Sequence, residues 1–104
     1  MIADFCYRFL LMSEKTAPAL AKLDTLLPLI KSMPAGADRD KLIEEGEALQ
    51  RAVAAFHMEA IRFRMHNVER LLKTAGSAAQ HQAFDELRHA LETAGFHTRS
   101  HSAP

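Results

Sequence analysis

Mostly apolar residues recur at alternating steps of four and three positions between Asp38 and Gly76, a stretch with no proline and one internal glycine. The row consists of Leu42, Gly46, Leu49, Val53, Phe56, Ala60, Phe63 and Asn67. This spacing is typical of the seam along which one long helix packs against another. We therefore expect a single helix over residues 38–75, with Asp38 as its N-cap and Gly76 as the residue that ends it.

A second apolar row widens the buried arc of this helix beyond that of a simple coiled coil. It consists of Ile43, Ala54, Ile61, Met65, Val68 and Leu72. An arc this wide needs two neighbouring helices. Phe56, Ala60 and Phe63 are expected in the central core, because the other predicted helices converge there.

Proline positions divide the chain before the long helix. Pro18 is best tolerated in a first turn, so a helix is expected over residues 17–33. Pro28 should then kink this helix or mark a restart. A short apolar stripe predicts a separate helical segment over residues 2–12.

Capping signals define the last helix. Ser77 and Gln80 have the spacing of a capping box, which predicts a helix from there to about Ala94. Gly95 followed by Phe96 should close that helix as a Schellman motif.

These elements predict an all-α fold: an antiparallel three-helix bundle with one long central helix (about 38–75) and a short N-terminal helical segment. Residues 1–96 are expected to form one domain and residues 97–104 a flexible polar tail. For the N-terminus an alternative stays open, because the sequence from Met12 onward also has the form of a natural start. Residues 1–11 would then be an extension.

The helix lengths predict self-association. At about 1.5 Å per residue the long helix would span roughly 54 Å and the last helix only about 26 Å. The N-terminal half of the long helix then has one neighbour within the chain, so we expect a homodimer or another protein partner to supply the second. The predicted interface consists of Leu42, Ile43, Gly46, Leu49, Gln50, Val53, His57 and Arg64.

Three polar members of that set, Gln50, His57 and Arg64, recur at seven-residue intervals and would stack on one line of the helix. Polar groups inside an apolar arc need hydrogen-bond partners. The line can fix a dimer register or bind an anionic group. In the structural alternative, Arg64 reaches solvent and His57 bonds a backbone carbonyl. The carboxylates expected near Arg64 are Asp4, Glu14 and, from a second copy, Glu47.

Charge and cysteine content narrow the class of partner. Thirteen Lys and Arg balance thirteen Asp and Glu, which argues against nucleic-acid binding. No apolar run reaches the ~20 residues of a membrane span. The single cysteine, Cys6, fits a reducing compartment. We expect a cytoplasmic protein that binds neither nucleic acid nor membrane.

Sequence signals for catalysis are lacking. There is no phosphate-binding glycine loop, no serine nucleophile elbow and no inward-facing carboxylate pair. Cys6 lies on the apolar stripe of its segment, which favours a buried, unreactive thiol. We therefore expect no enzymatic activity and no cofactor. Weak candidates for a metal site are His81, Asp85 and His89, spaced four apart on the last helix, where a solvated face is the alternative.

The residues His66-Asn67-Val68-Glu69-Arg70 resemble in part the H-x-L-K-G motif of histidine-phosphotransfer domains, which are small four-helix bundles with an exposed histidine. Val68 stands at the Leu position, whereas Glu69 and Arg70 replace the Lys and the Gly. The resemblance is limited to these residues and implies a phosphotransfer role for His66.

The function class favoured by the pattern is a small non-enzymatic interaction or regulatory protein that self-associates through an apolar helix face. The alternatives are a ligand- or metal-sensing helical bundle and a phosphotransfer module that uses His66.

Overall fold

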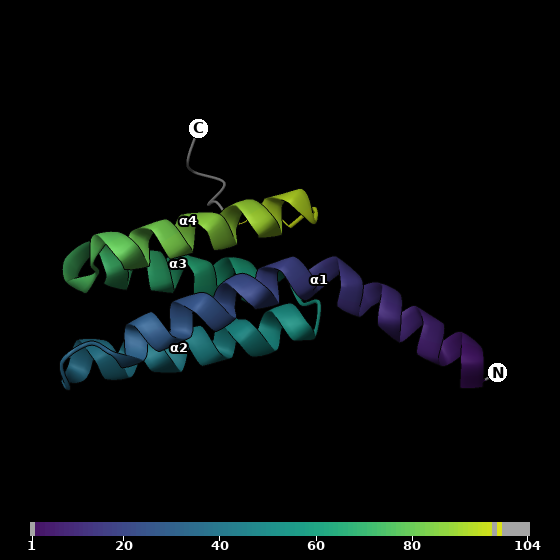
Figure 1. Cartoon of the computed structure of the whole chain (residues 1–104), viewed down its shortest axis with the longest axis horizontal. Coiled ribbons are helices and arrows are strands. Elements are labelled where there is room, and N and C mark those ends of the chain that lie inside the picture. Colours follow the sequence, from purple (N-terminus) through teal and green to yellow (C-terminus); the bar gives the residue numbers. More distant parts are fainter. Residues whose placement is uncertain (1, 97, 99–104) are drawn as a thin grey trace.

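In the computed structural model, the described residues form four helices: α1 (Ile2–Lys31), α2 (Ala37–Ala54), α3 (Met58–Ala75) and α4 (Ala78–Thr93). The structure describes the backbone of residues 2–96 and 98, and the side chains of residues 15–96 and 98. Successive helices run in opposite directions, so the chain forms an up-down-up-down bundle (Figure 1). The predicted all-α fold is confirmed. The predicted three-helix bundle with one long central helix is wrong.

The long helix predicted over residues 38–75 is broken at Ala55, Phe56 and His57. The N–H of Phe56 donates to the Val53 carbonyl (3.1 Å) and the N–H of His57 to the Ala52 carbonyl (3.0 Å), which together form a Schellman motif. Phe56 takes the left-handed position, with φ of 61°, where glycine is usual. A left-handed non-glycine residue costs roughly 1–2 kcal/mol. No glycine marks the turn in the sequence, and the spacing of the apolar residues continues through it. The spacing therefore predicted one helix where the structure has two.

The core lies between all four helices. Helix α1 packs against α2 and α4, and α3 packs against α2. The buried apolar side chains include Leu23, Leu26, Ile30, Leu42, Leu49, Val53, Ile61, Met65, Val68, Leu87 and Leu91. The apolar arc that was predicted to need a second chain is therefore covered within the same chain by α1 and α3. Phe56 and Ala60 pack against this core, but Phe63 does not, since it is 57% exposed.

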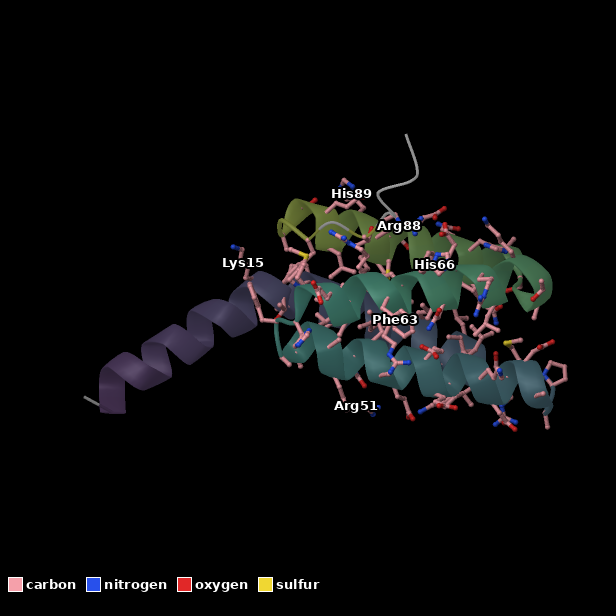
Figure 2. The ribbon with its side chains drawn as sticks, turned by 180° about the vertical axis from the view of Figure 1, so that it is seen from behind. Lys15, Arg51, Phe63, His66, Arg88 and His89 are labelled. Atoms are coloured by element: carbon pink, nitrogen blue, oxygen red, sulfur yellow. The ribbon has the colours of Figure 1, made fainter. Side chains whose placement is uncertain are left out.

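Helix α1 is continuous and includes both Pro18 and Pro28, so the predicted start of a new helix near residue 17 is wrong. Both prolines lie on the exposed side of the helix. Proline removes one helical hydrogen bond and bends the axis away from it. The axis of α1 changes direction near Lys15 (Figure 2), and the N-terminal part extends beyond the other helices (Figure 1).

The local capping signals are mostly confirmed. Ser77 caps α4 with the predicted capping box, and the buried Gln80 also donates from Nε2 to the Leu29 carbonyl (3.0 Å), which joins α4 to α1. Gly95, with φ of 98°, closes α4 in the predicted Schellman motif. The N-cap of α2 is Gly36, whereas Asp38 lies in the first turn. Gly76 ends α3 as its C-cap.

Two predictions fall on parts that the structure does not describe. The predicted tail 97–104 lies outside the described residues except for Thr98, and the side chain of Cys6 also lies outside them. Among the helices of the described part, none has the length and apolar character needed to cross a membrane.

Candidate functional site

The apolar residues predicted to form an interface lie inside the bundle. Leu42, Leu49 and Val53 are fully buried, and Ile43 is partly buried. Gly46 is also buried, and a Cβ there would come within 2.8 Å of the Leu27 side chain. Glycine at this position therefore lets α2 approach α1 closely. In this structure these residues pack the chain's own helices together.

The three polar residues predicted to share one line do not share it, because the helix ends between Gln50 and His57. Gln50 on α2 donates from Nε2 to Asp24 Oδ1 on α1 (3.4 Å). His57 is exposed and is the N-cap of α3. Arg64 lies on α3, which runs antiparallel to α2. Gln50 and Arg64 therefore make separate contacts with other helices instead of forming one line with His57.

Arg64 joins α3 to α2 through Glu45. Its NH1 group lies 3.1 Å from Glu45 Oε1 and 2.9 Å from Oε2. Its guanidinium also lies over the Phe63 ring, 5.2 Å from the centroid. The sequence pointed instead to Asp4 or Glu14, whose side chains lie outside the described residues, or to Glu47 of a second copy. The antiparallel turn between α2 and α3 explains the difference, since it brings Glu45 level with Arg64.

A buried arginine that sequence reasoning missed lies between α3 and α4. Arg88 is 7% exposed, donates from NH1 to Glu69 Oε2 (3.0 Å) and from Nε to Thr98 Oγ1 (3.2 Å), and lies over the Phe84 ring. These contacts connect both helices to the segment after α4. The signal was present in the sequence: Arg88 directly follows Leu87 in the inward row of α4 and precedes Leu91 by three positions.

Replacing Arg88 by Met is expected to lower the free energy of unfolding by about 1.5–3 kcal/mol, the usual contribution of hydrogen bonds to a charged group. Glu69 is partly exposed and can recover solvation, so the full penalty of an unpaired buried charge does not apply. Urea denaturation measures the change. Arg51→Met, at an exposed arginine on α2, is the control and should change stability by less than about 0.5 kcal/mol. Equal effects in both variants would contradict a structural role for Arg88.

An open groove of about 1050 Å³ runs between α1 and α4. Its lining includes small or apolar residues, namely Pro18, Ala78, Ala90 and Ala94. Charged residues line its two sides: Lys15 and Lys22 on α1, and Asp85 and Glu86 on α4. Lys22 and Glu86 approach each other to 3.5 Å, and both are largely solvated. The groove thus has a mostly apolar lining, with lysines on the α1 side and two carboxylates on the α4 side.

The three candidate metal ligands, His81, Asp85 and His89, are exposed and lie along the α4 side of this groove. Within the described residues, no three His, Cys, Asp or Glu side chains gather as a metal site requires. The three ligands therefore do not converge, because residues four apart on a straight helix follow one another along its axis.

His66 is exposed on α3, as a phosphotransfer histidine must be (Figure 2). It lies within one turn of Arg62 and Arg70 on the same helix. Arg70 is exposed at the position where the phosphotransfer motif has a small glycine. A large side chain there obstructs the approach of a partner to the imidazole.

Comparisons of the chain with protein-family models, with curated proteins and with solved structures find no match.

Proposed function

We propose that this chain is a small non-enzymatic interaction protein that holds an apolar helical segment of a protein partner in the groove between α1 and α4. The observation that carries this proposal is the open groove itself, with its mostly apolar lining and its charged residues on both helices. Binding of an amphipathic helix in a groove is a recurring mode of protein recognition.

The residues of the groove suit a helix better than a small molecule. Ala78, Ala90 and Ala94 have short side chains, which allow another backbone to approach α4 closely. The basic side on α1 and the acidic side on α4 favour one orientation of a partner that carries both charges. A small-molecule site, by contrast, is usually concave and encloses most of its ligand. This groove is open along α4, and its titratable side chains are solvated.

A fluorescein-labelled amphipathic peptide, with leucines on one helical face and mixed Lys and Glu on the other, is expected to bind this chain saturably. Ala90→Arg places a long charged side chain in the lining of the groove and should weaken binding by at least about tenfold, or ~1.4 kcal/mol. Fluorescence anisotropy measures the dissociation constant, and alanine-methyl NMR identifies the residues that the peptide touches.

Ala79→Arg is the matched control, because Ala79 is exposed on the same helix and does not line the groove. It should bind the peptide like the unmodified chain. The proposal fails if the unmodified chain shows no saturable binding, or if both arginine variants lose the same affinity. Methyl shifts confined to residues near Phe63 would also reject the groove as the site.

A further inference from the structure

The turn between α2 and α3 is closed by its own backbone hydrogen bonds, and contacts from outside the turn hold the Phe56 side chain. Phe56 adopts a left-handed conformation that its side chain disfavours. Its ring packs edge-on against the Phe96 ring, with centroids 4.9 Å apart, and the Lys15 ammonium lies 5.7 Å from its centroid. Lys15 lies on α1, and Phe96 lies in the segment that follows α4. Both contacts therefore support the left-handed conformation of Phe56 while the bundle is closed.

The sequence across the turn favours a continued helix. Residues 52–60 contain neither proline nor glycine, and four of them are alanine, the best helix former. The apolar row of α2 also continues into α3 without a change of period. If residues 55–57 became helical, Phe56 would leave the left-handed region and α2 and α3 would merge into one helix.

The contacts between the two halves of the chain do not depend on the turn. Arg64 on α3 bonds Glu45 on α2, Gln80 on α4 bonds the Leu29 carbonyl on α1, and Lys22 on α1 meets Glu86 on α4. Each contact joins a residue before the turn to a residue after it. If the turn straightens in two copies, the same contacts can form between the two chains. The α1–α2 half of one copy then packs against the α3–α4 half of the other.

We propose that the chain forms a domain-swapped dimer, in which the α2–α3 turn opens into one long helix and each copy donates its α3–α4 half to the other. Short connections under strain favour such exchange, since the dimer keeps the contacts of the monomer and relieves the turn. The strained Phe56 opposes the closed form, whereas its contacts with Phe96 and Lys15 support it. This proposal is independent of the groove, because α1 and α4 meet in both forms.

A charge exchange at Arg64 and Glu45 distinguishes the swapped dimer from any other dimer. Glu45→Arg leaves two arginines facing each other, and Arg64→Glu leaves two glutamates. In a swapped heterodimer of these two variants, the arginine introduced at position 45 of one chain meets the glutamate introduced at position 64 of the other. The unchanged Glu45 of the second chain meets the unchanged Arg64 of the first. Both pairs are restored only there, since neither a monomer nor an unswapped dimer can form either pair.

The two variants are unfolded together, refolded at high concentration and analysed by light scattering and thermal melting. We expect a mixed dimer that melts above either variant refolded alone. Co-refolding without such a dimer, or a mixed dimer that melts no higher than its parents, would overturn the proposal.

Substitutions of Phe56 test the turn directly and do not depend on the charged pair. Phe56→Gly and Phe56→Ala both remove the ring, but glycine accepts the left-handed turn and alanine favours the helix. After concentrated refolding, the dimer dissociation constant should be at least tenfold lower for Phe56→Ala than for Phe56→Gly. Phe96→Ala leaves the hinge sequence intact and should also raise the dimer fraction above that of the unmodified chain. Equal dimer fractions for the glycine and alanine variants, or monomers for all chains, would overturn the proposal.

Discussion

Leu49→Arg is expected to abolish folding rather than to separate two folded chains. Leu49 is fully buried between the helices of its own bundle, with 0% exposure. An arginine there places an unpaired charge in an apolar core, and an interior site offers it no route to water. The expected loss is about 4–5 kcal/mol or more, comparable with the whole stability of many small domains. Circular dichroism and urea denaturation measure it.

The matched control for Leu49→Arg is Phe63→Arg, which introduces the same side chain at an exposed position. That variant should stay folded and change the free energy of unfolding by less than about 1 kcal/mol. The two arginine variants also distinguish whether Leu49 lies in the core of its own bundle or faces a partner. A folded monomer with a normal urea melt for Leu49→Arg would show that Leu49 faces a partner and that the arrangement of α2 in the bundle is wrong.

Phe84→Ala should lower the free energy of unfolding by about 3–5 kcal/mol, the usual cost of deleting a buried phenylalanine ring. Phe84 is 2% exposed and lies under the Arg88 guanidinium, so its loss leaves a cavity beside a buried charge. Phe63→Ala is the same chemical change at a residue that is 57% exposed, and it should cost less than about 1 kcal/mol. Urea melts of both variants test this ranking. A larger loss of stability for Phe63→Ala would show that Phe63, and not Phe84, lies in the core.

Local signals in the sequence were the reliable ones. The capping box of Ser77 and Gln80 and the Gly95–Phe96 closure depend on residues within one turn of each other, so their spacing is enough to predict them. The break at Phe56 has the backbone hydrogen bonds of a Schellman motif but no glycine to mark it, and the Phe56 ring contacts Phe96 and Lys15, which are distant in sequence. No local pattern carries that information, so the period of apolar residues predicted one helix where two exist.

The candidate site shows the same limit. Whether Leu42 and Leu49 face a partner or their own chain depends on where α3 lies, and that follows from the missed turn. The partner of Arg64 could not be predicted either, because Glu45 comes near it only in the antiparallel arrangement. The groove between α1 and α4 joins residues from opposite ends of the chain. The sequence singled out three residues that line this groove, His81, Asp85 and His89, but it did not predict the groove itself.

The packing of α4 has a consequence for the order in which the chain folds. Helix α4 follows α3 in sequence, yet it packs mainly on α1 and only slightly on α3. For α4 to contact α1, the chain must close a loop that contains both α2 and α3. Closing this loop costs more entropy than forming a hairpin of neighbouring helices, so the contact forms more slowly. During synthesis, the side of α1 that receives α4 stays uncovered until the last helix has left the ribosome. In the finished protein, hydrogen exchange should show α4 opening together with the part of α1 that it covers, because α4 packs mainly on α1.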